Sequence, residues 1–476
     1  MAISSIFVFY YMCGVVMVEK IGPNIQRYNY NTTNRIADVK QFGTAQTQLS
    51  EPSFASAKIV SMYPNGTNIE LRTELNSNQE KEEYKTILAN LDKNSKKVVE
   101  TLLKNGVLLN SNSNDKSTVL DNLYKIVTEP RAQGLDAKTI LKDTIATIAY
   151  PYLITQQFGD IPSKYREIAI AANNNSQSDS ENLQQNPSEI DVEHSGTCVA
   201  ASTEFKLAKQ MPAEFSRFAQ ELSSPKMSVD KKIGLNNLAD DTLSAIWLLN
   251  AFEIPYKMDN FDNANLTFAP DKNAIIRAQI QTTDKDPYER TPLDVLMQST
   301  FMQVGSQQSY NTLTDKRGGK FNQNDKGLIE FEKTFTESVA LDKNILSVTY
   351  QTVDENARLV GYETGMDTLK KHLTTALDKG ENVIIGYTQT NENNIIVNGH
   401  EITIVGYKTD NNGKLIFICN DTDDGISRPI EYSEDYLLPK IHHAALPKEV
   451  AEPDMNIVPS WIEGIEAYKQ MRKQAA

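Results

Sequence analysis

The chain has 476 residues, of which 39% are hydrophobic and 23% are charged, and it carries a formal net charge of −14. This composition suits a globular protein and excludes a wholly disordered chain. The length exceeds what one hydrophobic core usually organises, so we expect two folded units joined by a linker. The negative charge repels a phosphate backbone, and the sequence has no Lys/Arg cluster interleaved with aromatic residues, so we expect no nucleic-acid partner.

Residues 1–18 form an apolar N-terminal segment, with an almost uninterrupted apolar run over 2–18 that is closed by Glu19 and Lys20. About 17 residues is the lower limit for a membrane-spanning helix. As a signal peptide, the segment lacks a basic n-region and a small-residue cleavage site. A third interpretation is that translation starts at Met17. We expect membrane contact only through residues 2–18, with a secreted or anchored protein if they act as signal or anchor, and a cytoplasmic protein if translation starts at Met17.

The next three segments differ in periodicity. Residues 19–77 are rich in Asn, Thr, Gln and Ser and are expected to be an extended or disordered lead. Residues 78–172 have apolar residues at helical spacing, which predicts a small helical bundle with N-caps at Ser117 and Asp136. Residues 173–189 are almost free of apolar side chains and predict a linker. We interpret the bundle as either an autoinhibitory prosegment or an independent adaptor.

Residues 190–446 are expected to form a second unit that begins with helices and ends with strands. Within it, residues 367–379 place apolar side chains on one helix face, Gly380 ends that helix, and residues 382–387 predict a buried strand. The remaining residues, 447–476, are expected to be a tail with an amphipathic helix around residues 459–472.

The three cysteines lie in very different surroundings, and their odd number does not indicate a disulfide framework. Cys13 belongs to the N-terminal apolar segment, and Cys419 ends an apolar run where we expect a buried, inert thiol. Cys198 follows a Gly-containing turn and opens a predicted helix, which Ser195 or Thr197 can cap. A helix N-terminus favours the thiolate and supplies a backbone N–H for an oxyanion, although a small core residue would also fit this position.

A second polar group lies about 200 residues downstream. His400 heads a predicted strand, residues 410–413 form a hairpin turn, and the return strand ends at the polar pair Asn420 and Asp421. Register decides which member of the pair shares the face of His400, because side chains alternate along a strand. A two-residue turn at residues 412–413 selects Asp421, whereas a loop over residues 409–413 selects Asn420. The sequence leaves both alternatives open.

The segments around Cys198, His400 and the Asn420–Asp421 pair resemble the papain-like cysteine peptidase superfamily in chain order, and Gly399–Tyr407 is similar to the segment that carries the catalytic His of that family. The strand before it resembles the bacterial members that process leader peptides, in which an Asp follows an Asn. The resemblance covers residues 190–446. It implies an α+β, papain-like fold, with a helical subdomain whose Cys helix packs on an antiparallel sheet carrying the His, here preceded by the helical bundle.

Three features depart from that family. The local signature around its nucleophile, C-G-[SA]-C-[WY], is not matched by residues 195–199. No Gln occurs in the six positions before Cys198, where family members place an oxyanion donor; Gln184 and Gln185 lie in the linker. The spacing to His400 exceeds the roughly 130–150 residues of papain and cathepsins, so an insertion is expected between them. Losing one oxyanion donor costs about 2.7–4 kcal/mol of barrier unless His194, Ser195 or Thr197 substitutes for it.

The sequence therefore predicts a cysteine peptidase that cleaves peptide or isopeptide bonds, with Cys198 as nucleophile, His400 as base and Asn420 or Asp421 as orienting group. A transglutaminase-like or deamidating acyl transferase would use the same residues, and a papain-like protein that only binds a partner is the non-catalytic alternative. The expected partner is a protein or peptide substrate. No cofactor is required, and only five His residues, two of them the adjacent His442 and His443, give little support for a metal site.

Overall fold

A computed structural model describes residues 72–157, 195–283, 289–319, 327–354, 356, 358–362, 365–423 and 427–452. The apolar segment 1–18, most of the lead 19–77, the linker 173–189 and the tail beyond residue 452 lie outside the described residues. Within the described residues the chain has an α+β fold, with helices packed around antiparallel sheets, as the sequence predicted. No helix in these ranges is long and apolar enough to cross a membrane.

The helical segment predicted over residues 78–172 contains four α-helices up to residue 149: α4 (Asn78–Ala89), α5 (Lys93–Lys104), α6 (Val119–Thr128) and α7 (Ala137–Ala149). Asp136 caps α7 as expected, because its carboxylate accepts the backbone N–H of Thr139. The cap of α6 is Thr118 rather than the predicted Ser117, since Thr118 and Asp121 form a reciprocal capping box.

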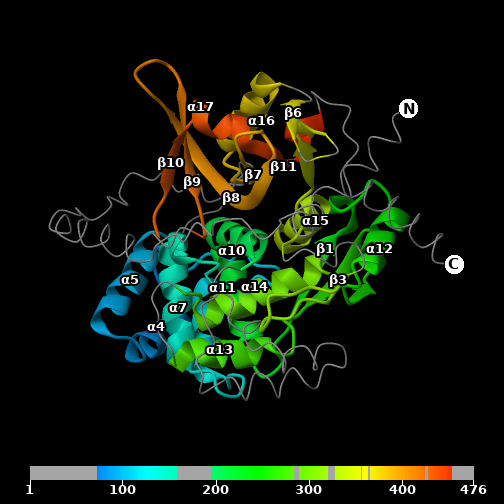
Figure 1. The fold of residues 1–476 in the computed structure, drawn as a ribbon. Coiled ribbons are helices and arrows are strands. Elements are labelled where there is room, and N and C mark those ends of the chain that lie inside the picture. The colour runs from blue at the N-terminus through cyan, green and yellow to red at the C-terminus, as the bar shows by residue number, and fades with distance from the viewer. Residues whose placement is uncertain are drawn as a thin grey trace.

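These helices do not enclose a core of their own. Their apolar faces join the same buried cluster as α10 (Cys198–Gln210), α11 (Pro212–Leu222) and α14 (Pro292–Gly305). Asn122 on α6 is fully buried and donates its amide to the Ala213 carbonyl oxygen on α11, at 3.3 Å. The helices at the start of the described chain therefore support the helix that begins at Cys198, and Figure 1 shows them side by side in the lower half of the molecule.

The described part of residues 223–344, where the resemblance predicts an insertion, is a mixed segment of helices and strands, which we call the insertion. It contains a three-stranded antiparallel sheet of order β1-β3-β2, formed by β1 (Val229–Gly234), β2 (Tyr256–Met258) and β3 (Asn263–Phe268). Its helices are α12 (Thr242–Ala251), α13 (Ala274–Thr283), α14 and α15 (Glu330–Leu341).

A six-stranded antiparallel sheet carries the C-terminal half of the predicted site, in the order β10-β9-β8-β7-β11-β4. Its strands are β4 (Ile345–Thr349), β7 (Val383–Thr390), β8 (Ile396–Thr409), β9 (Leu415–Asn420), β10 (Ile430–Ser433) and β11 (Ile441–Pro447). A separate hairpin pairs β5 (Gln351–Val353) with β6 (Leu359–Tyr362), and the short helices α17 (Glu434–Leu437) and α18 (Lys448–Ala451) flank β11.

The two faces of the six-stranded sheet contact different helices. On one face, α16 (Met366–Asp378) buries Leu369, Leu373 and Ala376 against alternate apolar residues of β7 and β8. On the other face lie α10 and α15, and Figure 1 shows α10 directly beneath β8. The sheet that carries His400 thus rests on the helix that begins with Cys198.

Candidate active site

Cys198 is the first residue of α10 and is partly exposed. Thr197 occupies the N-cap position, but it forms no side-chain cap, because its hydroxyl donates to Gln298 Oε1 at 2.9 Å. The Ser195 hydroxyl is also used inside the turn, where it accepts the Thr197 backbone N–H at 3.1 Å. The cap expected from Ser195 or Thr197 is therefore not formed, which leaves the positive end of α10 without a side-chain cap at the thiol.

The turn before Cys198 is held by a buried carboxylate of the insertion, Asp315. Its Oδ2 accepts the Gly196 backbone N–H at 2.6 Å, and its Oδ1 accepts the hydroxyls of Ser195 at 3.1 Å and Tyr310 at 2.8 Å. Asp315 is fully buried and adopts a left-handed backbone conformation with φ 53°. Three charge-assisted hydrogen bonds therefore fix both the carboxylate and the turn that it contacts.

A glutamine from the segment after α7 reaches the same turn. The Gln156 amide is buried, and its Nε2 donates to the Ser195 carbonyl oxygen at 3.4 Å. Its Oε1 accepts the hydroxyl of Thr422 at 2.8 Å, which sets the orientation of the amide. Gln156 lies 42 positions before Cys198, yet in space it is next to the turn where the sequence offered no glutamine.

His400 lies within β8 rather than at its start, because the strand begins at Ile396. Its Nε2 lies 2.7 Å from Asp421 Oδ1. The Cys198 side chain lies close enough to the imidazole to act on its pKa, while Nε2 is already engaged by Asp421. Burial lowers the pKa of His400, but the hydrogen bonds and charges of Asp421 and Cys198 outweigh it and raise that pKa well above its usual range.

The hairpin that joins β8 to β9 differs from both predicted turns. Thr409 pairs with Leu415, so the loop contains the five residues 410–414. The Asp410 carboxylate accepts the backbone N–H groups of Asn412 and Lys414 at 2.8 and 2.9 Å, and Gly413 adopts a left-handed φ of 80°. With an unbroken ladder, this loop would place Asn420 on the His400 face.

A β-bulge at Val405 reverses that outcome. Beyond the bulge Thr403 pairs with Asn420, so these two residues share one face while His400 and Asp421 share the other. Asn420 is buried, and Val405 packs towards the core that contains α10. Of the two candidate orienting residues, the structure therefore brings Asp421 to His400 and turns Asn420 away.

Glu401, the residue after His400 in β8, ties the strand to a helix and to a non-adjacent strand. Its carboxylate lies 3.2 Å from Lys333 Nζ on α15 and 3.0 Å from His443 Nε2 on β11. Burial opposes ionisation, but Lys333 and His443 lower the pKa of Glu401 to about 2. The His443 ring reaches Glu401 by crossing β7 over Gly386, where any Cβ would collide with that ring. Gly386, which lies in the strand predicted over residues 382–387, is thus required for the contact between the non-adjacent strands β8 and β11.

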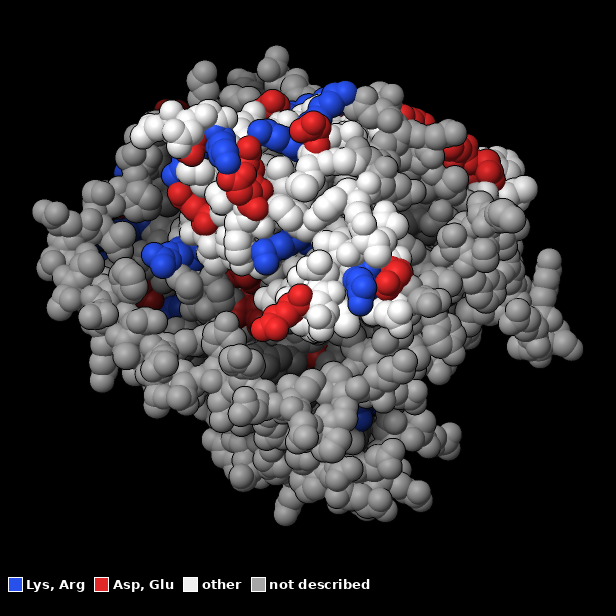
Figure 2. All heavy atoms as spheres, turned by 45° about the horizontal axis from the view of Figure 1, so that its top comes forward, with Lys and Arg blue, Asp and Glu red and all other residues white. Residues whose placement is uncertain are grey.

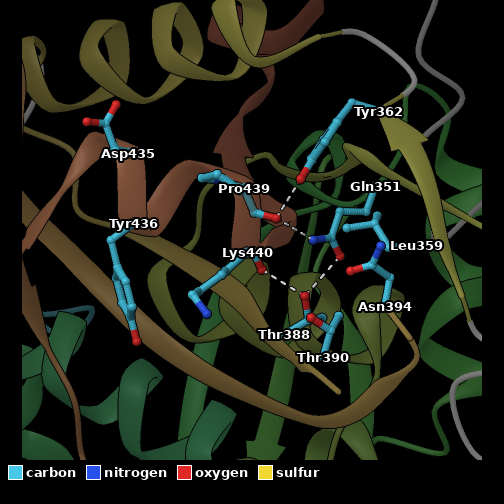
Figure 3. Close-up of a pocket in the computed structure, with 10 residues that line it drawn as sticks. All are labelled: Gln351, Leu359, Tyr362, Thr388, Thr390, Asn394, Asp435, Tyr436, Pro439 and Lys440. Atoms are coloured by element: carbon cyan, nitrogen blue, oxygen red, sulfur yellow. Dashed lines mark hydrogen bonds between the residues drawn. The ribbon is translucent and has the colours of Figure 1, made fainter. Parts of the chain in front are cut away.

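A cavity of about 310 Å³ lies between β7, the β5–β6 hairpin and the segment 435–440. Thr388 and Thr390 of β7 line it, and the strand neighbour Tyr387 is the residue that pairs with His400. Figure 3 shows Lys440 pointing towards Tyr436, whose ring centroid lies 4.7 Å from Lys440 Nζ. The Tyr436 hydroxyl is 2.8 Å from that of Tyr387. Because Tyr387 pairs with His400, this hydrogen bond links the cavity wall to the strand pair that carries His400.

The surface around the sheet carries charges of both signs. In Figure 2, Lys and Arg side chains alternate with Asp and Glu over the described part of this face, and acidic residues border a hollow. Within the described ranges, no group of three or more His, Cys, Asp or Glu residues is arranged to hold a metal ion.

Sequence reasoning missed Gln156 and Asp315. The Gln156–Gln157 pair before the linker was only a weak signal for the role of Gln156, because nothing in the sequence showed that residues 155–157 return to the turn before Cys198. Asp315 lies in the expected insertion, where only the polar density of the segment Ser306–Arg317 set it apart.

Comparison with known proteins gives no assignment. No protein-family model matches the chain, and neither the curated proteins nor the solved structures contain a significant match.

Proposed function

We propose that the chain is a cysteine hydrolase of peptide or isopeptide bonds, with Cys198 as nucleophile, His400 as general base and acid, and Asp421 as the residue that orients His400. One observation carries the proposal: His400 Nε2 lies 2.7 Å from Asp421 Oδ1, and the same imidazole neighbours the Cys198 thiol at the start of α10. A nucleophile, a base and an orienting group within hydrogen-bond reach are what this chemistry requires. The papain-like assignment of the fold belongs to the same proposal.

In the first step, His400 Nδ1 accepts the thiol proton, and the resulting imidazolium donates its Nε2–H to Asp421. The raised pKa of His400 favours this ion pair, and the uncapped N-terminus of α10 stabilises the thiolate. The Cys198 sulfur then attacks the substrate carbonyl carbon and forms a tetrahedral oxyanion. His400 returns its proton to the leaving amine as the C–N bond breaks, and a thioester remains on Cys198.

The oxyanion needs donors beside the sulfur, and two groups are suitably placed. The backbone N–H of Cys198 lies at the helix N-terminus. We assign the second donor to Gln156, whose buried amide donates one N–H to the Ser195 carbonyl oxygen and has a second N–H to offer. Gln156 takes the place of His194, Ser195 and Thr197 in this role, because Ser195 and Thr197 are engaged within the turn, while His194 lies outside the described residues.

Water completes the hydrolysis: His400 removes its proton, the hydroxide oxygen attacks the thioester carbon, and the carboxylic acid leaves as the thiol is restored. The same thioester would transfer its acyl group to an amine in a transglutaminase-like reaction. Neither the surface charge nor the partly exposed thiol distinguishes water from an amine as the acyl acceptor. Analysis of the reaction product identifies which acceptor is used.

The proposal is tested by incubating the full chain with a diverse peptide library and identifying cleaved products by mass spectrometry. We expect cleavage by the parent chain and a trapped acyl group on Cys198 at short times. Cys198→Ala and His400→Ala should both abolish cleavage, while Cys419→Ala should retain it. If the parent neither cleaves nor acylates any peptide, or if His400→Ala cleaves as fast as the parent, the proposal is wrong.

A further inference from the structure

An apolar patch lies on the insertion, on the exposed side of α12. Leu243 and Phe261 are 80% and 83% exposed, and Ile246 and Trp247 beside them are only partly buried. Leu243 and Trp247 are four residues apart and share one helix face. The Thr242 hydroxyl donates to the Phe261 carbonyl oxygen at 2.9 Å, which ties the β2–β3 turn to the start of the helix. These four residues, Leu243, Ile246, Trp247 and Phe261, form the α12 patch.

The described chain ends next to this patch. Lys448, the first residue of α18, places its Nζ 2.6 Å from Asp240 Oδ1, and Asp240 immediately precedes the N-cap residue of α12. The same ammonium lies 3.8 Å from Glu452 Oε1, and Glu452 is the last described residue. Figure 1 shows α12 at the right-hand edge of the molecule, beside β1 and β3. The chain beyond Glu452 therefore starts close to the first turn of α12.

The sequence beyond Glu452 has a pattern that fits an apolar surface. Trp461, Ile462, Ile465 and Tyr468 recur at helical spacing, with Glu463 and Glu466 between them. Pro459 suits a first helical position. Residues 453–456 can span about 13 Å when extended, which is enough to carry the apolar face from Glu452 to the α12 patch.

We propose that residues 457–471 dock on the α12 patch as an amphipathic helix, with Trp461, Ile462 and Ile465 against Leu243, Trp247 and Phe261. Asp240, Asp241 and Asp262 border the patch and are exposed. They favour the basic end of the segment, where Lys469, Arg472 and Lys473 lie, and they repel an anionic bilayer. A second copy of this acidic chain meets the same repulsion.

The two tryptophans of the chain make the test direct, because Trp247 belongs to the patch and Trp461 to the docking segment. Trp461→Phe leaves Trp247 as the sole indole reporter in the full chain. Its fluorescence and acrylamide quenching are compared with those of the same variant ended after Glu452. A point variant, Ile465→Asp, disrupts the apolar face without shortening the chain, and Gln470→Asp adds the same charge to the opposite face as the matched control.

We expect truncation and Ile465→Asp to raise the quenching constant of Trp247 about twofold and to shift its emission to longer wavelength, since a covered indole becomes exposed. Gln470→Asp should leave both unchanged. Equal quenching in the full and shortened chains overturns the proposal. It is overturned as well if Trp247 becomes protected only at higher protein concentration or on addition of lipid vesicles, because the occupant is then a second copy or a bilayer. A cooperative denaturant-unfolding transition shows that each variant is folded.

Discussion

The start of α10 and the end of β9 each carry a cysteine, and the same carboxylate acts on both. Cys198 is partly exposed at a helix N-terminus, and Asp421 influences it through His400. Cys419 is fully buried in β9, where burial and the negative charge of Asp421 both raise the pKa of its thiol. Asp421 therefore reaches Cys198 only through a histidine, whereas it opposes ionisation of Cys419 directly.

The comparison teaches that thiol reactivity in this fold is set by position rather than by residue type. A first-turn residue has free backbone N–H groups nearby and access to solvent, whereas a central strand residue has neither. The burial expected for Cys419 is confirmed. The following predictions remove, one at a time, the features that distinguish the surroundings of Cys198 from those of Cys419.

The largest effect should appear in alkylation. In a Cys13→Ser background, iodoacetamide at pH 6 should modify one thiol rapidly, because only Cys198 is partly exposed and paired with an imidazole. Cys198→Ala should abolish this rapid modification, and Cys419→Ala should leave it intact, as read by intact-protein mass spectrometry. Rapid loss of both thiols, or rapid labelling that survives in Cys198→Ala, would contradict the contrast between the two regions.

The second prediction concerns the oxyanion donor. Gln156→Ala should lower kcat on a peptide identified from the library by about 10²–10³-fold with little change in KM, because the donor acts on charge that develops in the transition state. Gln157→Ala is the matched control, since its amide bonds to Asp423 rather than to the turn. Alkylation of Cys198 forms no oxyanion and should be equally fast in both variants. If Gln156→Ala and Gln157→Ala lose kcat equally, Gln156 has only a structural role and is not the oxyanion donor.

The third prediction concerns the orienting carboxylate. Asp421→Asn replaces a charge-assisted hydrogen bond worth about 1.5–3 kcal/mol and should slow turnover about 10- to 150-fold. Asn420→Ser, on the opposite face of the same strand end, should leave turnover unchanged. If Asn420→Ser slows turnover more than Asp421→Asn does, the β8–β9 register that pairs Thr403 with Asn420 is wrong.

The same carboxylate predicts a pH dependence of stability. Asp421 raises the pKa of His400 in the folded chain, so its contribution is fully present below the unfolded imidazole value of about 6.5 and is lost as pH rises through the raised folded value. In a Cys198→Ala background, the free energy of unfolding should exceed that of the Asp421→Asn double variant by about 1.5–3 kcal/mol at pH 6. Denaturant titrations should find this difference shrinking at alkaline pH, and a difference that grows there would reverse the assignment.

Local signals predicted the local parts of the site. The apolar spacing after Cys198 and the helix over 367–379 needed no distant partner, and both helices lie within a residue or so of their predicted bounds. The choice between Asn420 and Asp421 could not be predicted, because one extra residue at Val405 changes which side chains face His400. That bulge depends on packing against α10, which no window of β8 contains. The roles of Gln156 and Asp315 could not be predicted for the same reason, since each residue reaches the turn before Cys198 only through tertiary folding.

The smallest effect should come from Asp315, which we treat as a positioning residue because it bonds to the turn before Cys198 and acts on the thiol only through that turn. Asp315→Asn keeps the shape but turns one acceptor into a donor, so one of its hydrogen bonds is lost and kcat should fall about two- to tenfold. Asp271 is another buried carboxylate of the insertion, and it accepts hydrogen bonds from Ser299, Asn273 and Thr312 but from no residue of the turn.

Asp271→Asn is therefore the matched control. Both substitutions should lower the midpoint of denaturant unfolding, but only Asp315→Asn should also lower kcat and slow alkylation of Cys198. If the two variants lose kcat in proportion to their loss of stability, Asp315 supports the insertion as a whole. A loss of kcat specific to Asp315→Asn would mean that the inserted segment contributes to catalysis by holding the turn that presents the thiol.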